Sequence, residues 1–209
     1  MTKMADIMSL HAAGDVRCRW PGNNKGTVRL EVADANGAGM ASLRTLCEDD
    51  VTEAYVAGLN DAKVNRFLVG VRAQLQSLET VRSYVAANWH SDTDLLLGIF
   101  MDGGLRGTVR VHEISQDQGH AYLGAVLFDK AYWRRGIGHA CLAMVKQFCF
   151  ENLDLKLLTA GIYKSNTASQ KAFGYAGFSY VPERDRDDPY DTIQFWEAPD
   201  MRTSPDLKG

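Results

Sequence analysis

The sequence predicts an α/β (α+β) fold, in which a mixed and mostly antiparallel sheet is flanked by helices. Three consecutive strand-like runs, residues 95–101, 105–114 and 121–128, indicate an antiparallel meander, because Gly103 and Gly104 form a turn between the first two. Before the meander, apolar residues recur at spacings of three and four through about residue 91, which indicates helices. After it, strand-like and helical segments alternate, which favours a sheet covered by helices.

The chain divides into three segments. Residues 1–40 are rich in Gly, Asn, Ala and Asp without a sustained period, so we expect an N-terminal extension that is partly flexible. A short alternation at residues 28–32 leaves one additional strand open. We place a single domain at residues 41–200, a length suited to one hydrophobic core, and a C-terminal tail at residues 201–209.

The remaining elements follow from local signals. A strand at residues 41–46 precedes a run of three acidic residues, which favours a helix start because the helix dipole is positive there. The other expected elements are a helix from residue 137 to about 153, a strand at 155–162, a helix at 166–176 and a strand at 193–197.

The composition excludes several classes of protein. The formal net charge is -3, without the excess of Lys and Arg that drives nucleic-acid binding. No run of 18 apolar residues and no signal-like N-terminus occurs, so we expect a cytoplasmic protein without a membrane segment. The four cysteines form no C-x-x-C pair and the five histidines no H-E-x-x-H motif, so no metal is expected.

A glycine-rich turn at Gly136–Gly138 lies where a strand gives way to a helix. The first N–H groups of a helix lack intrahelical partners, so the turn predicts an anion site, and Arg134 and Arg135 add positive charge. The spacing excludes a P-loop, which needs G-x-x-x-x-G-K-[ST], and disfavours a dinucleotide fingerprint, which would need glycine at Cys141. An ordinary helix-start turn is the alternative.

A second motif follows the next expected strand. Its positions N-x-x-[AS]-x-x-x-[YF]-x-x-x-G-F are occupied by Asn166, Ser169, Phe173, Gly177 and Phe178. With the turn, which matches x-x-G-x-G/A, it resembles the GNAT (Gcn5-related N-acetyltransferase) superfamily over about residues 43–197. Trp133 stands where many members have Arg or Gln. Tyr132, Trp133, the helices before the meander and residues 189–194 resemble the RimJ/RimL branch.

The resemblance implies a GNAT-like acyl-CoA acyltransferase fold with acetyl-CoA as the donor. The pyrophosphate would bind the amides of the turn, and the pantetheine arm would follow the strand that ends near residue 128. The cofactor-binding residues that it implies are Val126, Leu127, Phe128, Arg134, Arg135, Gly136, Ile137, Gly138, His139, Asn166, Ser169 and Phe173. A backbone N–H near Val126 or Leu127 would stabilise the oxyanion.

An amine attacks a thioester only when unprotonated, so the reaction needs a general base or a water chain. The candidate bases are His112, Glu113, His120, Tyr122 and Asp191. We favour Glu113, acting through water, because it lies on a meander strand beside the expected cleft. His112 and Glu113 are adjacent in that strand, so we expect their side chains to point to opposite faces.

A general acid that protonates the leaving group contributes less in this reaction, because a thiolate leaves readily. Many GNAT members have a tyrosine acid where this chain has Phe173. Ser169 lies one turn earlier on the same helix face, and its hydroxyl is our candidate donor to the sulfur. Alternatively, it bonds only the cofactor arm or its own helix backbone.

The sequence thus predicts an acetyl-CoA-dependent N-acetyltransferase, in which a primary amine attacks the thioester directly. We favour an amino-sugar nucleotide or another small amine as acceptor. The alternatives are an α-amine acetyltransferase for protein N-termini, of the ribosomal-protein type, and a non-catalytic acyl-CoA-binding module, which the missing tyrosine would permit. A homodimer is left open.

Overall fold

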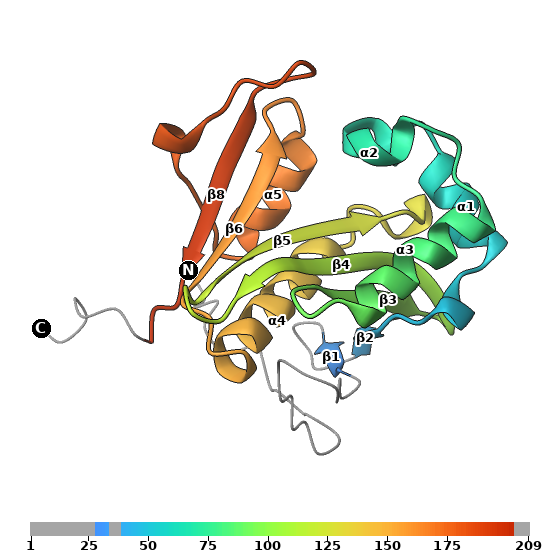
Figure 1. The fold of residues 1–209 in the computed structure, drawn as a ribbon, viewed down its shortest axis with the longest axis horizontal. Helices are drawn as coiled ribbons and strands as arrows, with labels where there is room; N and C mark the ends of the chain where they lie inside the picture. The colour runs from blue at the N-terminus through green and yellow to red at the C-terminus, as the bar shows by residue number, and fades with distance from the viewer. Residues whose placement is uncertain (1–27, 34–38, 203–209) are drawn as a thin grey trace, which may run out of the picture.

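The computed structural model describes residues 28–33 and 39–202 (Figure 1). The α-helices and strands of the described residues are β1 (Arg29–Ala33), β2 (Gly39–Thr45), α1 (Glu53–Asn60), α2 (Val69–Arg72), α3 (Leu78–His90), β3 (Leu95–Met101), β4 (Gly104–Ser115), β5 (His120–Leu127), α4 (Ile137–Asn152), β6 (Leu157–Tyr163), α5 (Thr167–Tyr175), β7 (Ser179–Tyr180) and β8 (Ile193–Pro199). Four 3-10 turns join them: η1 (Glu48–Asp50), η2 (Asn65–Phe67), η3 (Lys130–Tyr132) and η4 (Pro182–Arg184).

The described strands form one sheet in the order β1-β2-β3-β4-β5-β6-β8-β7. Neighbouring strands pair antiparallel throughout, except for β5 and β6, which are parallel. The predicted meander is β3-β4-β5, and α4 provides the long crossover that a parallel pair requires. The predicted fold class, a mixed and mostly antiparallel sheet flanked by helices, is confirmed.

The strand left open at residues 28–32 is also confirmed, as β1. It pairs antiparallel with β2, and Val28, Leu30 and Val32 are buried in the core. This part of the expected N-terminal extension therefore belongs to the sheet. Residues 1–27, for which the extension was also expected, and residues 203–209 of the expected tail lie outside the described residues.

Helices cover both faces of the sheet, with α1 and α3 in front of β3 and β4 in Figure 1 and α4 behind. On the α4 side, Leu97, Val109 and Leu123 join one apolar cluster with the helix. On the other side, Leu96 and Phe128 join a second cluster with α1 and α3. Because both faces are covered, β3 is buried along almost its whole length instead of alternating.

Two of the cysteines belong to the α4 side of the core. Cys141 and Cys149 are fully buried, and burial raises the pKa of both thiols, that of Cys141 to about 12. A thiol with so high a pKa stays protonated at neutral pH and is a poor nucleophile. Both side chains therefore act as small hydrophobic groups in packing.

The sheet divides between β5 and β6. These strands pair only through His120–Tyr122 and Leu157–Thr159, while β5 continues beside β4 and β6 continues beside β8. Figure 1 shows the two halves of the sheet separating from this point. We call it the fork; it is the place where backbone groups of β5 lose a strand partner on one side.

The close packing of α1 against Phe128, which follows β5, can be tested at Gly58 of α1. A Cβ atom there would lie 2.7 Å from Phe128 Cδ2 and 2.9 Å from its Cβ, while Phe128 stacks on Tyr55 at 4.8 Å. We expect Gly58→Ala to lower the free energy of unfolding by about 1–3 kcal/mol, because overpacking outweighs the gain in helix propensity. Urea unfolding measures the change.

Gly70 of α2 provides the control, because a Cβ atom at this position meets nothing within 4 Å. Gly70→Ala should leave stability unchanged or raise it by up to about 1 kcal/mol. Equal stability of the two variants would contradict the packing of α1 against Phe128.

Candidate functional site

The predicted turn has the geometry of an anion site. Arg134 and Gly136 both have positive φ angles, 62° and 81°, and Gly136 is the N-cap of α4 without a side-chain cap. The first helical hydrogen bond runs from Ala140 N–H to the Gly136 carbonyl, so the preceding amides of the turn point free of the helix. A Cβ atom at Gly138 would meet nothing within 4 Å, which leaves open space beside these amides.

The charge around the turn is positive. The first turn of α4 contains no acidic residue, and the side chains of Arg134 and Arg135 are exposed. The Arg135 guanidinium lies 5.2 Å from the centroid of the Tyr132 ring, whose hydroxyl donates to Asp102 at 2.6 Å. An anion at the helix N-terminus would therefore meet amides, the positive end of the dipole and two guanidinium groups.

Register decides which backbone groups of β5 face the fork. Phe128 N–H donates to the Arg106 carbonyl on the β4 side, and hydrogen-bonding direction alternates along an antiparallel pair. The N–H of Val126 therefore also points to β4, whereas that of Leu127 points away, to the side where β6 has separated. The Trp133 indole N–H donates to the Leu127 carbonyl on that side, at 2.7 Å. Of the two amides considered for the oxyanion, only Leu127 has the required direction.

The second motif forms the start of α5. Asn166 is the N-cap, and its Oδ1 accepts the Ser169 N–H at 3.2 Å. Among the residues that the structure describes, the hydroxyl of Ser169 has no hydrogen-bond partner, and the side chain is half-buried. The rings of His139 in the first turn of α4 and Tyr175 at the end of α5 lie 5.6 Å apart, so the C-terminal end of α5 lies beside the N-terminal end of α4.

Three predicted cofactor residues have buried side chains. Phe173 is 3% exposed and packs edge-on against Phe178 at 5.0 Å, and Phe128 is 5% exposed beneath α1. Ile137 is also in the core. We therefore assign the side chains of all three to packing, which leaves Ile137 and Phe128 only backbone atoms to offer a ligand. Val126 and Leu127 are half-buried on opposite faces of the sheet. Val126 packs against the cluster that contains α1 and α3, and Leu127 packs against the cluster that contains α4.

The expectation that His112 and Glu113 point to opposite faces is wrong. The β4–β5 register shifts between His112 and Ser115, and Glu113 has a φ of 52°. This bulge interrupts the alternation of side chains, so Glu113 Oε1 lies 3.5 Å from His112 Nδ1. The Glu113 side chain is 72% exposed, which makes it a solvated carboxylate next to a histidine.

The other candidate bases fall into two places. Asp191 accepts the backbone N–H groups of Ser165 and Thr192 at 2.7 and 2.8 Å, and its bonds from Ser165 lower the pKa of its carboxyl group. It therefore stabilises the connection between β6 and β8. By contrast, His112, Tyr122 and His120 lie together on β4 and β5, next to Thr159 at the fork. Thr159 was not anticipated, although a polar residue in an apolar strand was a usable signal.

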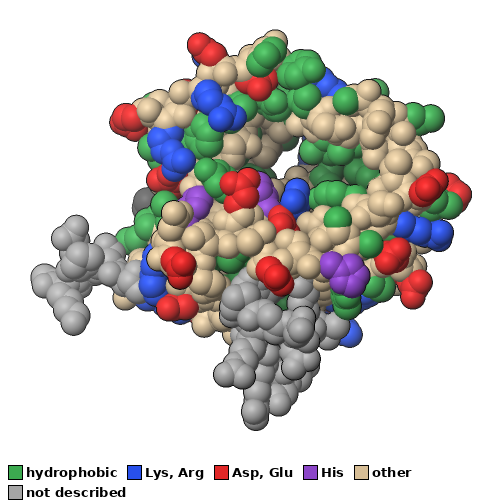
Figure 2. Space-filling view, in the orientation of Figure 1, with side chains coloured by type: hydrophobic (Ala, Val, Ile, Leu, Met, Phe, Trp, Pro, Cys, Tyr) green, Lys and Arg blue, Asp and Glu red, His purple; other side chains and the backbone are tan. Residues whose placement is uncertain are grey.

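Figure 2 shows an opening between the two halves of the molecule. Two contacts between segments that are far apart in the sequence bridge the two sides of this opening. The Arg72 guanidinium lies 4.6 Å from the centroid of the Tyr190 ring, and the rings of Phe67 and Tyr163 are 6.4 Å apart. The helical segment before the meander therefore meets the β6–β8 connection.

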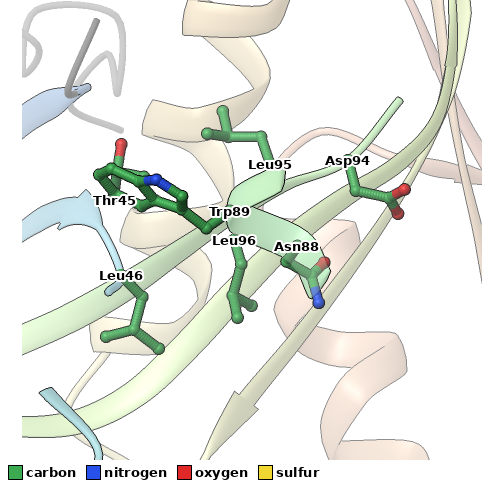
Figure 3. A pocket seen from close by; sticks show the side chains of 7 residues that line it. All are labelled: Thr45, Leu46, Asn88, Trp89, Asp94, Leu95 and Leu96. Atoms are coloured by element: carbon green, nitrogen blue, oxygen red, sulfur yellow. The ribbon is translucent and has the colours of Figure 1, made fainter. Parts of the chain in front are cut away.

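Figure 3 shows a different pocket, between the end of β2, α3 and the start of β3. It is lined by Thr45, Leu46, Asn88, Trp89, Asp94, Leu95 and Leu96. No predicted site residue lines it. In the described part of the chain, no helix is long and apolar enough to cross a membrane, and no group of three or more His, Cys, Asp or Glu could hold a metal ion.

Comparison with known protein families assigns the fold that contains the glycine turn, the fork and the Asn166 cap. Residues 41–179 match the model of the acetyltransferase (GNAT) domain, so the chain belongs to this family. It is an acetyl-CoA-dependent N-acetyltransferase. The resemblance to the superfamily noted in the sequence is therefore confirmed.

Solved structures share the fold at low identity. A probable acetyltransferase has a TM-score of 0.69 at 18% identity, covering 78% of this chain and 94% of its own. RimL, a ribosomal L7/L12 α-N-protein acetyltransferase in complex with coenzyme A, has 0.63 at 17%, covering 76% and 93%. Spermidine N-acetyltransferase from Vibrio cholerae, in complex with CoA and spermine, has 0.64 at 14%, covering 76% and 95%. No curated protein sequence matches this chain.

The turn can be tested with Gly138→Ala. The added Cβ atom meets no protein atom, and Gly138 is in the helix without a positive φ, so folding should be unaffected. A methyl group in the space beside the amides should weaken acetyl-CoA binding on the order of tenfold, because a lost hydrogen bond to a charged group costs about 1.5–3 kcal/mol. Calorimetric titration measures the affinity.

S-acetylpantetheine, which lacks the pyrophosphate, provides the matched ligand, and Gly70→Ala the matched variant. Turnover of S-acetylpantetheine should be the same in Gly138→Ala and wild type. An unchanged affinity of Gly138→Ala for acetyl-CoA would place the pyrophosphate elsewhere.

Proposed function

We propose that this enzyme acetylates a small primary amine, which enters through the opening of Figure 2. The observation that carries this proposal is that two contacts between distant segments enclose the opening. Arg72 with Tyr190, and Phe67 with Tyr163, join the two sides of the opening, so an acceptor has to pass through a bounded passage. A folded protein surface does not fit such a passage, whereas a small or extended amine does.

The charge of the bordering loop supports a cationic acceptor. Residues 183–191 contain five carboxylates and two arginines, and Asp188 accepts a hydrogen bond from the Tyr163 hydroxyl at 3.4 Å. An amine that is protonated in solution is attracted to such a loop. The diphosphate of an amino-sugar nucleotide would be repelled, so we favour a cationic small amine within the class.

The donor side uses residues of this chain in separate roles. Bound acetyl-CoA supplies a thioester, whose carbonyl carbon the amine attacks. The amides of residues 137–139 with Arg134 and Arg135 bind the pyrophosphate, and the Leu127 N–H is directed to stabilise the oxyanion. The Ser169 hydroxyl donates its hydrogen to the departing sulfur. We also expect the enzyme to act in the cytoplasm; that location and a homodimer stay predictions.

A thiol-release screen with acetyl-CoA tests the acceptor class. The panel contains polyamines, amino sugars, amino-sugar nucleotides and peptides with free N-termini. Turnover with polyamines or amino sugars supports the proposal. Turnover restricted to peptides would instead favour the protein N-terminal acetyltransferase, a class that includes the structural neighbour RimL. Acetyl-CoA binding without thiol release for every amine would favour the non-catalytic module.

The role of Ser169 is tested by Ser169→Ala. If the hydroxyl donates to the sulfur, kcat should fall about tenfold, the low end for proton transfer, because the thiolate is a good leaving group. The affinity for acetyl-CoA should not change. Thr167→Ala, an exposed change on the same helix, is the control. A weaker affinity with unchanged kcat would show that Ser169 only binds the cofactor arm.

A further inference from the structure

Two aromatic rings lie together beside the turn of α4, one from each of the helices α4 and α5. The centroids of the His139 and Tyr175 rings are 5.6 Å apart, and the ring planes are inclined at 54°. A Cβ atom at Gly136 would lie 3.2 Å from His139 Cε1, so the imidazole lies directly against the turn. We call these two side chains the ring pair. It borders the anion site on the side of α5.

Tyr175 takes no part in the packing of its own helix. The C-terminal end of α5 is held by Phe173, Ala176 and Phe178, which are buried in the core. Tyr175 is 71% exposed, more than any other aromatic side chain in the described part of the chain. A single exposed aromatic residue needs no explanation by itself. The position of Tyr175 beside the anion site is what gives its exposure a use.

Coenzyme A leaves the turn in two directions, because its pantetheine arm and its adenosine are attached to opposite ends of the pyrophosphate. We assign the arm to the fork, and Trp133 lies on that side, since its indole N–H donates to the Leu127 carbonyl. The ring pair lies instead between α4 and α5. Only one ribose separates the adenine base from the pyrophosphate, so the base has to bind next to the turn.

The face of α5 that carries Tyr175 also carries a positive charge. Lys171 precedes Tyr175 by four residues, so the two exposed side chains are neighbours on one face of the helix. Coenzyme A has a 3′-phosphate on the ribose that bears the adenine. A base on Tyr175 would bring this phosphate towards a lysine one helical turn away.

We propose that the ring pair binds the adenine base of acetyl-CoA and that Lys171 binds its 3′-phosphate. Aromatic side chains bind nucleobases by stacking, and the exposed Tyr175 ring provides the surface for it. His139 positions the Tyr175 ring and connects it to the turn. The inference rests on the donor side of the proposed function, in which the pyrophosphate binds the turn, and it is independent of the acceptor.

The consequence is selection of the donor. Phosphopantetheine thioesters, including those attached to carrier proteins, have the same arm and the same thioester as acetyl-CoA but no adenosine. The fork and the Leu127 amide therefore cannot distinguish the two kinds of thioester. The ring pair and Lys171 make the enzyme specific for the free coenzyme A thioester.

The ring pair is tested by calorimetric titration with coenzyme A and with 4′-phosphopantetheine, which lacks the 3′-phosphoadenosine part. Tyr175→Ala should weaken the affinity for coenzyme A on the order of tenfold, because the stacked base loses its aromatic partner. The affinity for 4′-phosphopantetheine should stay at the wild-type value. Tyr175→Phe keeps the ring and is the matched control, with the wild-type affinity for both ligands.

His139→Ala tests the positioning role. It should weaken coenzyme A binding in the wild-type background and have little further effect in the Tyr175→Ala background, because the two rings act together. Its affinity for 4′-phosphopantetheine should not change. Thermal unfolding of each variant shows whether the fold is intact.

Lys171 is tested with dephospho-coenzyme A, which lacks only the 3′-phosphate. Lys171→Met should weaken the affinity for coenzyme A by about fivefold, the size expected for an exposed ion pair, and leave that for dephospho-coenzyme A unchanged. Lys63→Met, which removes an exposed lysine between α1 and η2, is the control and should change neither affinity.

Two outcomes for Tyr175→Ala would overturn the proposal. An unchanged affinity for coenzyme A would place the adenine elsewhere, and an equal loss for coenzyme A and 4′-phosphopantetheine would show that the variant disturbs the turn itself. Failure of the pyrophosphate assignment looks different, because Gly138→Ala would then bind coenzyme A as wild type does. Failure of the proposed acceptor class appears only in the thiol-release screen, since these titrations contain no amine.

Discussion

The separation of β5 from β6 is the constraint on which the rest of the site depends. The two strands share three paired residues each and then diverge, so the outward amides of β5 have no strand partner beyond Tyr122. Buried backbone groups need a hydrogen-bond partner, and a ligand arm laid along β5 would supply one.

Each of the helices α4 and α5 buries one face in the core and leaves another part accessible to a ligand. α4 buries one face in the core through residues such as Cys141 and Phe148, while its N-terminal turn remains open beside Gly138. α5 buries Phe173 against Phe178 and leaves Ser169 half-exposed. Phe173 therefore packs α5 against the core and supports the helix that carries the Ser169 hydroxyl. Because the Phe173 side chain is buried, it does not extend into the cleft.

Charge is distributed in accordance with the reaction. The turn of α4 is positive, which suits the anionic part of the donor, and the loop at residues 183–191 is negative, which suits an ammonium acceptor. Partial burial and a neighbouring arginine lower the pKa of each of the two histidines His112 and His120 on β4 and β5.

The sequence by itself determined the fold class, the family and the turn of α4, because these depend on local patterns: apolar periodicity, a left-handed glycine and two motifs of fixed spacing. Even the weak alternation of β1 was readable. Only the tertiary structure decided the direction of the Leu127 amide, the exposure of Glu113 and the contact of His120 with Thr159. These depend on strand register and on a bulge at residues 112–115, which pairing between distant segments sets and no local pattern encodes.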